Sequence, residues 1–136
     1  MNSQCTFPAT TSADASQDVP PQMRDALALV ECIGGLELIQ KVCYLFRTTS
    51  DERMAKIHEA LAAGEAAEIA RLAHALKGSS AQIGAEPLRQ AAVALEQEAV
   101  ALDPVALAAR VECLGREVRA ARSQIDRYHT ARGEHG

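Results

Sequence analysis

The sequence predicts an all-α protein, an antiparallel four-helix bundle with one short additional helix at its N-terminal end. Three observations predict this fold. Alanine and leucine, which favour helices, dominate the 136 residues, of which 48% are hydrophobic and only 3% aromatic. Apolar residues recur at spacings of three and four, the period of a helix with one buried face. No segment of any length alternates between apolar and polar residues as a β-strand does.

The chain divides into three parts. Residues 1–20 are rich in Ser, Thr, Ala, Asp and Pro and lack periodicity, so we expect a disordered tail. Residues 21–130 carry the apolar pattern and are expected to form the bundle, followed by a frayed C-terminal tail over residues 131–136. The initial Met1 and the tail that follows it favour a free-standing protein over a fragment of a larger one.

The first half of the bundle consists of a short helix and a long one. The short helix is expected over residues 21–33, and Gly34 and Gly35 end it. The polar stretch TTSDE, residues 48–52, would either kink the long helix or restart it with Ser50 as its N-cap. Gly64 closes the long helix. Its apolar stripe keeps spacings mostly of three and four: Leu36, Ile39, Cys43, Phe46, Met54, Ile57 and Leu61.

The other three helices have clearer boundaries. One covers residues 65–83 and ends at Gly84. The next begins near Pro87, a residue suited to the first turn of a helix, and buries Leu88, Ala92 and Leu95. Asp103 and Pro104 cap the last helix. Its apolar stripe alternates spacings of four and three without a break, as in a bundle helix: Leu107, Val111, Leu114, Val118, Ala121, Ile125 and Tyr128.

Charge and hydropathy exclude several classes of protein. The net charge of -4 argues against a nucleic-acid-binding protein, which normally carries a basic patch. No apolar run approaches the roughly 18 residues of a membrane span, and the N-terminus lacks the pattern of a signal peptide. The four cysteines form neither a CxxC pair nor a metal-ligand spacing, so we expect buried free thiols in a reducing cytoplasm. They are Cys5, Cys32, Cys43 and Cys113.

One histidine, His74, lies on the polar face of the helix at residues 65–83. With about 100° of rotation per residue and Leu72 at zero, the buried stripe falls between about -20° and +80°, and His74 falls near 200°. Arg71 and Lys77 lie one turn before and after it, about 60° to either side. Three small residues, Ala70, Gly78 and Ala81, lie within about 40° of it. The stripe comprises Ile69, Leu72, Leu76, Ser79, Ser80 and Ile83.

This arrangement suggests a chemistry. Glycine lowers helix stability by about 1 kcal/mol relative to alanine, so Gly78 does not serve the helix itself. We interpret it as clearing the surface so that another protein can approach the ring of His74. A solvated imidazole is largely neutral and nucleophilic near pH 7, and the two cations would attract an anion. Phosphoryl transfer between two proteins requires these features, because its catalysis is mainly positioning and charge stabilisation.

The same residues resemble a known family. The segment IARLAHALKGSSAQIGAEPLRQAAVALE, residues 69–96, is similar to the core of the histidine-containing phosphotransfer (HPt) domain of bacterial multistep phosphorelays. That core has an A-H-x-L-K-G-S block, then G-A, a spaced Leu and a Leu-Glu. The matching residues are Ala73, His74, Leu76, Lys77, Gly78, Ser79, Gly84, Ala85, Leu88, Leu95 and Glu96, with Gly34-Gly35, Leu45-Phe46 and Gly64 upstream.

The resemblance implies roles for several residues. His74 would accept a phosphoryl group from the aspartyl phosphate of one receiver domain and pass it to the aspartate of another. Lys77 would neutralise phosphate charge, and Gly78 would permit docking. The partners implied are receiver domains of hybrid histidine kinases and response regulators. HPt domains bind no nucleotide, and magnesium comes from the receiver, which agrees with the absence of a phosphate-binding loop or kinase motif here. The protein would be a monomeric carrier without ATP-dependent kinase activity.

Alternatives stay open for the individual residues. Arg71 would either join the docking surface with Ala81 or pair with Glu68 one turn earlier. Ser79 and Ser80 would hydrogen-bond to carbonyls one turn earlier, whereas Gln82 could orient the ring or the phosphate. No cofactor or metal site is expected, because no carboxylate or cysteine at helical spacing on the histidine face completes a site with His58. His129 and His135 would lie in the fraying end, and the last helix could also form a dimer seam.

The alternative function is a helical scaffold or inhibitor that binds a signalling partner through the same face without transferring a phosphoryl group. The combination of a nucleophilic histidine, a nearby cation and a glycine-cleared surface favours phosphotransfer over this alternative.

Overall fold

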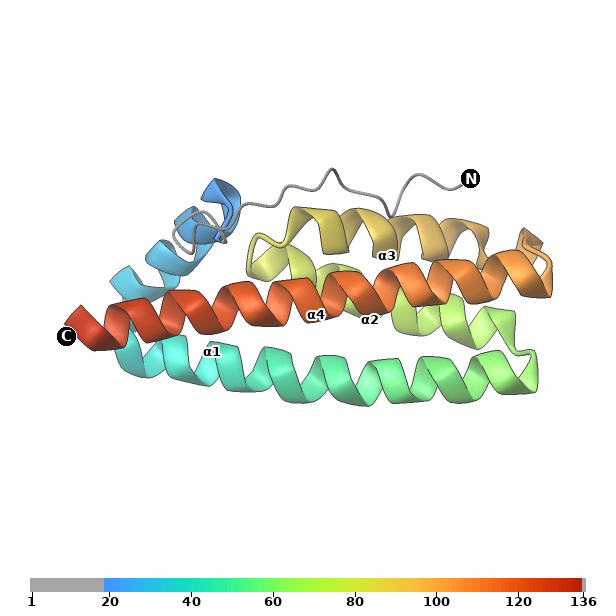
Figure 1. Cartoon of the computed structure of the whole chain (residues 1–136), viewed down its shortest axis with the longest axis horizontal. Helices are drawn as coiled ribbons and strands as arrows, with labels where there is room; N and C mark the ends of the chain where they lie inside the picture. Colours follow the sequence, from blue (N-terminus) through green and yellow to red (C-terminus); the bar gives the residue numbers. More distant parts are fainter. Residues whose placement is uncertain (1–18, 136) are drawn as a thin grey trace.

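A computed structural model describes residues 19–135 of the chain as four long helices (Figure 1). They are α1 (Pro21–Ala63), α2 (Ala66–Gln82), α3 (Glu86–Glu98) and α4 (Pro104–His135), and one 3-10 turn, η3 (Ala99–Ala101), precedes α4. The described part of the chain contains no strand, so the predicted all-α bundle is confirmed. Residues 1–18 of the expected tail lie outside the described residues. The last helix extends to His135, past residue 130.

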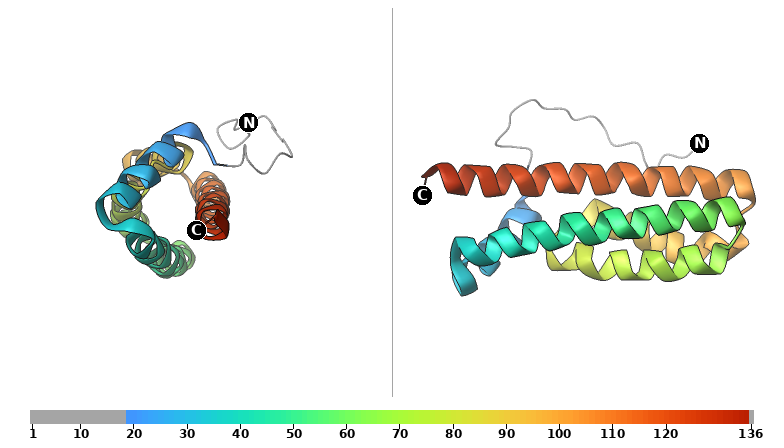
Figure 2. Two further views of the ribbon diagram at one scale, coloured as in Figure 1. Left: turned by 90° about the vertical axis from the view of Figure 1, so that its left-hand side faces the viewer. Right: turned by 90° about the horizontal axis from the view of Figure 1, so that it is seen from below.

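The helices bury their apolar stripes against one another. In the end-on view (Figure 2) the helices surround a common core, with α4 on the side away from α2. The stripe predicted for α4 is buried throughout. The largest fully buried side chains come from all four helices: Met23, Leu27, Ile39, Ile57, Ile69, Leu76, Ile83, Leu88, Leu95, Val111, Leu114 and Ile125. Burial of such side chains, about 1.5–3 kcal/mol each, is the main force that holds the bundle together.

The predicted end of the first helix at the glycine pair is a break within α1. Gly35 has φ 72° and ψ -168°, a conformation that L side chains rarely adopt, and α1 changes direction there (Figure 1). The residues before the break, 21–34, are called the leading segment below. This segment packs closely on the turn between α2 and α3, because a Cβ at Gly84 would lie 2.6 Å from the carbonyl oxygen of Gln22.

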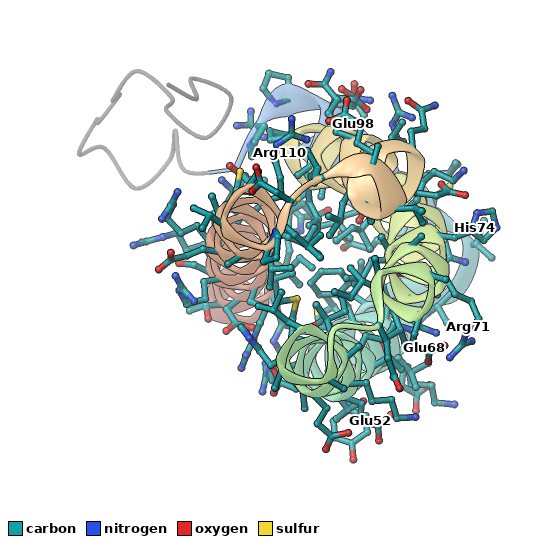
Figure 3. The ribbon with its side chains drawn as sticks, turned by 90° about the vertical axis from the view of Figure 1, so that its right-hand side faces the viewer. Glu52, Glu68, Arg71, His74, Glu98 and Arg110 are labelled. Carbon is teal, nitrogen blue, oxygen red and sulfur yellow. The ribbon has the colours of Figure 1, made fainter. Side chains whose placement is uncertain are left out.

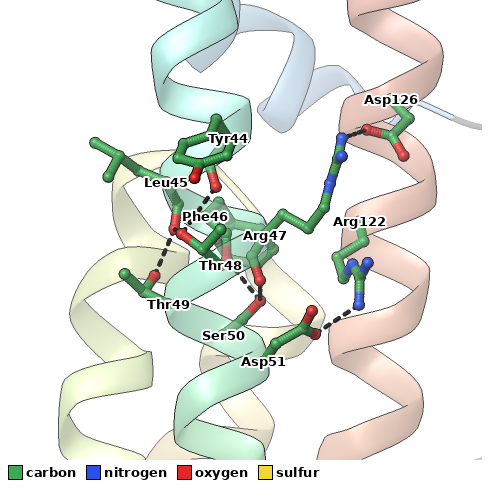
Figure 4. A network of polar contacts seen from close by, with 10 residues as sticks. All are labelled: Tyr44, Leu45, Phe46, Arg47, Thr48, Thr49, Ser50, Asp51, Arg122 and Asp126. Carbon is green, nitrogen blue, oxygen red and sulfur yellow. Dashed lines mark hydrogen bonds and ion pairs between the residues drawn. The ribbon is translucent and has the colours of Figure 1, made fainter.

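The predicted interruption at residues 48–52 is wrong. The helix continues through this stretch, and Ser50 is buried and donates a 2.6 Å hydrogen bond to the carbonyl oxygen of Phe46 (Figure 4). Its hydroxyl therefore binds back within the helix instead of capping a new one. On either side of it, Arg47 pairs with Asp126 at 2.8 Å and Asp51 with Arg122 at 2.6 Å, which joins α1 to α4.

The other predicted boundaries are close to those observed. Gly64 and Gly84 adopt left-handed conformations, with φ of 73° and 72°, just after α1 and α2. Pro87 lies in the first turn of α3. The carboxylate of Asp103 accepts a 2.8 Å hydrogen bond from the backbone N–H of Ala106, as an N-cap does.

The cysteines agree only in part with the expectation of buried free thiols. Cys43 is a buried free thiol, and burial raises its pKa to about 11. Cys32 is free but exposed, and Cys113 is buried but disulfide-bonded. Cys5 lies outside the described residues. Within residues 19–135, none of the helices has an apolar stretch that could cross a bilayer.

Glu117 is an acidic side chain buried within α4. Burial raises the pKa of its carboxyl, an effect that the charge of Arg116 only partly opposes. A raised folded-state pKa means that the stability contributed by the protonated carboxyl is fully present below the unfolded-state pKa. This contribution is lost as the pH rises through the folded-state pKa.

We therefore expect Glu117→Gln, which stays neutral, to raise the Tm by a few degrees at about pH 7 and to leave it nearly unchanged at about pH 3, where the carboxyl is protonated in both the folded and the unfolded state. Thermal melts at the two pH values measure this. Glu112→Gln, at an exposed position of the same helix, is the control and should change the Tm at neither pH. A Glu117→Gln variant that melts below the wild type at pH 7 would show that the ionised carboxylate stabilises the fold.

Candidate functional site

His74 projects from the outer face of α2, on the side of the bundle opposite α4 (Figure 3). Its side chain is 64% exposed. The predicted buried stripe of this helix is inside the core, apart from Ser79, which is half-buried. The helical wheel therefore assigns the faces of α2 correctly, and it correctly turns His74 away from the core.

The ring of His74 contacts a carboxylate from the neighbouring helix α3. Its Nδ1 lies 2.7 Å from Oε2 of Glu96, whose other oxygen, Oε1, lies 3.1 Å from Nζ of Lys77. One carboxylate thus joins the histidine and the lysine. The sequence alone indicates no role for Glu96 beyond its place in the Leu-Glu motif. The contact joins two helices, so helical spacing within α2 gives no indication of it.

The ionised carboxylate of Glu96 favours one tautomer of the His74 ring. The ammonium group of Lys77 first, and the ring of His74 second, lower the pKa of the Glu96 carboxyl by hydrogen bonding to its ionised form. An ionised carboxylate can only accept a hydrogen bond, so Nδ1 of His74 carries the proton and donates it. In the neutral ring, Nε2 then carries the lone pair, and it is the nitrogen left free of Glu96.

Two of the three small residues predicted beside His74 lie on its exposed face, whereas Ala70 is half-buried and packs against the core. Gly78 and Ala81 are exposed, and a Cβ added to Gly78 would have no heavy atom within 4 Å. The backbone next to the histidine is therefore open to a protein surface. Gln82 is also exposed. Arg71 forms a bidentate ion pair with Glu68 at 2.5 and 2.9 Å, the alternative that the sequence left open for it.

The remaining polar residues of the histidine helix have structural partners. Ser80 is buried and donates a 2.6 Å hydrogen bond to the carbonyl oxygen of Leu76, and Ser79 makes longer bonds to the carbonyls of Ala75 and Leu76. This confirms the predicted bonding one turn back. His58 is exposed on α1. Within the described residues, no three His, Cys, Asp or Glu side chains converge to hold a metal ion.

Comparison with known proteins identifies the family of this site. The model of the Hpt domain family matches residues 41–128, which include the histidine helix, Glu96 and most of α4. Searches of the curated proteins and of the solved structures found no significant match. The family match extends over well over half of the chain, and it agrees with the helical bundle that presents His74. The chain belongs to the Hpt domain family, the histidine phosphotransfer domains of phosphorelays.

Proposed function

We propose that this protein is a phosphorelay intermediate whose phosphoacceptor is Nε2 of His74. Hpt domains carry phosphoryl groups on histidine and interact with receiver domains. The observation that carries the assignment to His74 is its exposed ring, held at Nδ1 by Glu96 with Nε2 free. Such a ring is oriented for attack, and its neutral tautomer presents the Nε2 lone pair without any further rearrangement.

The transfer step balances without an added proton. The Nε2 lone pair attacks the phosphorus of a receiver aspartyl phosphate, an N–P bond forms, and the acyl phosphate O–P bond breaks to leave an aspartate carboxylate. The ring then carries a positive charge, because Nδ1 keeps its proton. The Glu96 carboxylate at 2.7 Å stabilises that charge. Attack by the aspartate of a second receiver on the same phosphorus reverses these changes.

Lys77 supports this step through charge. Its ammonium group lies on the helix of His74, one turn after it, and is held by the second oxygen of Glu96. It keeps the carboxylate ionised, and it places a positive charge near the incoming phosphoryl group. Magnesium, which stabilises charge in the aspartyl phosphate, belongs to the receiver domain.

The partners would dock over the small residues of α2. Gly78 and Ala81 leave the backbone uncovered, and Arg71 and Gln82 border the same exposed face. We place the protein in the cytoplasm as a monomer that meets the receiver domains of a hybrid histidine kinase and of a response regulator in turn. Docking to one face allows only one receiver at a time, as a relay requires.

The test is transfer of labelled phosphate. A receiver domain is first phosphorylated with labelled acetyl phosphate and then incubated with this chain, which is expected to become labelled. The label should be lost in acid and retained in alkali, because phosphohistidine is acid-labile and alkali-stable. Digestion and mass spectrometry should place the phosphate on His74. If the chain binds the phosphorylated receivers and stays unlabelled, it is the scaffold of the alternative function.

Glu96→Gln tests the role assigned to the carboxylate. The amide keeps the size of the side chain and removes the charge, so we expect single-turnover transfer to His74 to slow by roughly 10- to 100-fold, the cost of a lost hydrogen bond to a charged group. Glu86→Gln is the matched control, since Glu86 belongs to the same helix and is ion-paired with Arg89. Equal transfer rates for the two variants would remove Glu96 from the mechanism.

A further inference from the structure

Cys113 is a buried residue of α4 that lies outside the hydrophobic core. Only 5% of it is exposed, yet it does not belong to the cluster of core side chains that its neighbour Leu114 joins. It is disulfide-bonded, whereas the two other cysteines of the described part of the chain, Cys32 and Cys43, are both free. The chain has four cysteines, which leaves Cys5 to complete an intramolecular bond.

Cys113 lines a groove between α3 and α4 that encloses a cavity of about 250 Å³. Ala91 and Ala94 form part of its α3 side, so the groove has room for side chains of another segment. Ala94 lies two residues from Glu96, about 200° around the helix. Because Glu96 contacts His74, the groove lies on the opposite face of α3 from the site at His74.

The groove also contains a carboxyl without a polar partner. Glu117 lies one turn after Cys113 on α4, lines the same cavity and is only 9% exposed. No described residue hydrogen-bonds to it or forms an ion pair with it, whereas Arg110 beside it lies 2.6 Å from Glu98. Buried polar groups nearly always have a hydrogen-bond partner, so Glu117 indicates an occupant of the groove that donates one. The backbone N–H groups of an extended segment are donors of this kind.

The N-terminal segment, residues 1–18, is long enough to reach this groove. Val19, which follows it directly, lines the same cavity as Arg127 of α4. From Arg127 back to Cys113 the distance along α4 is about 21 Å, since each residue of a helix rises about 1.5 Å. The chain from Val19 back to Cys5 spans up to about 46–50 Å when it is extended. It can therefore reach Cys113 with length to spare.

We propose that Cys113 is a redox-responsive site at which Cys5 forms a reversible disulfide, and that this bond latches the N-terminal segment into the groove between α3 and α4. In the cytoplasm, where we place the protein, thiols are kept reduced and the disulfides that do form are mostly transient and redox-sensing. The latch would thus close under oxidation and open again as the thiol pool recovers. Its place on α3 and α4 leaves the exposed ring of His74 uncovered.

A peroxide supplies the oxidation. One thiolate attacks an oxygen of hydrogen peroxide, the O–O bond breaks, and the cysteine becomes a sulfenic acid while hydroxide takes up a proton and leaves as water. The other thiolate attacks the sulfenic sulfur, so the S–S bond forms, the S–O bond breaks and a second water leaves. Two electrons pass from the two thiols to the peroxide. Two molecules of glutathione reverse the step and leave as glutathione disulfide.

The first test maps the disulfide in the full chain. The reduced protein is treated with hydrogen peroxide, unfolded, alkylated with iodoacetamide and digested without reductant. We expect a joined pair of peptides that contains Cys5 and Cys113, alkyl groups on Cys32 and Cys43, and separation of the pair by dithiothreitol. If Cys113 is alkylated, or is joined to a different cysteine or to a second copy of the chain, the proposal is wrong.

The second test measures the latch by thermal melting. Oxidation is expected to raise the Tm of the wild type by roughly 5 °C or more, because the bond closes a loop that includes most of the chain. Cys5→Ser should lose this increase while its reduced form melts as the reduced wild type does. Cys32→Ser is the matched control and should keep the increase, since Cys32 is an exposed free thiol. A wild type whose Tm does not respond to oxidation would show that the bond latches nothing.

Ala94→Leu tests the occupancy of the groove. Ala94 is half-buried and lines the cavity, so a leucine there fills the space that the segment would enter. Ala109→Leu, at an exposed position of α4, is the control. Each variant is compared with its own reduced form, so that an effect on the bundle itself cancels. We expect Ala94→Leu to reduce the increase in Tm on oxidation to about half and Ala109→Leu to keep it. Equal increases in the two variants would show that the segment does not occupy the groove.

Discussion

His74→Gln is expected to lose all acceptance of phosphate from a phosphorylated receiver while the bundle stays folded. Glutamine has no nucleophilic nitrogen, so the N–P bond cannot form, whereas docking over the small residues of α2 is unaffected. The side chain is 64% exposed, and substitutions at such positions change stability by about 0.5 kcal/mol or less. Labelling and thermal melting are both measured on the purified chain.

His58→Gln is the matched control for this variant. His58 is also exposed on a helix, yet it belongs to α1. The His58→Gln variant should accept phosphate on His74 at the wild-type rate. Phosphate retained on the His74 variant, or lost from the His58 variant, would show that the acceptor has been assigned to the wrong histidine.

Substitutions at Gly78 should move folding and function in opposite directions. Gly78→Ala is expected to stabilise the isolated domain by up to about 1 kcal/mol, because alanine is the better helix former and its Cβ meets nothing within 4 Å. Gly78→Leu should also fold, since the position faces solvent. Its side chain would stand beside the ring of His74 and obstruct the receiver, so both affinity and transfer rate should fall steeply as the side chain grows.

The measurement for Gly78 is a pair: thermal melting of the domain alone and transfer from a phosphorylated receiver. Ala109→Leu is the control, because it adds a similar side chain to an exposed position of α4. Normal transfer by Gly78→Leu would show that no partner approaches this surface. Loss of folding in the same variant would instead show that Gly78 packs against a neighbour.

The parts of the fold that depend on local chemistry could be predicted from the sequence. The stripe of α4, the left-handed glycines at 64 and 84 and the cap at Asp103 all follow from spacing or from the preferences of one residue type. Ser50 was predicted wrongly because its hydroxyl has two local options, to cap a new helix or to bind back to Phe46. In the structure the helix continues and buries Ser50, so the hydroxyl binds back to the carbonyl oxygen of Phe46.

The candidate site could also be predicted only in part from the sequence. The exposure of His74 and the open surface at Gly78 follow from one helical wheel. The contact between His74 and Glu96 depends on how α3 packs on α2. This packing is a matter of tertiary geometry, which the spacing of residues within one helix does not reveal.

The break at Gly35 also sets the phase of α1. In one uninterrupted helix, Ile39 would lie about 120° around the axis from Leu27, because twelve residues turn through about 1200°. The stripe before the glycine and the stripe after it would then face different directions, and only one of them could enter the core. Both Leu27 and Ile39 are fully buried, because the non-helical residue resets the rotation between the two halves. A substitution that extended the helical conformation through residue 35 would therefore force one of the two stripes out into solvent.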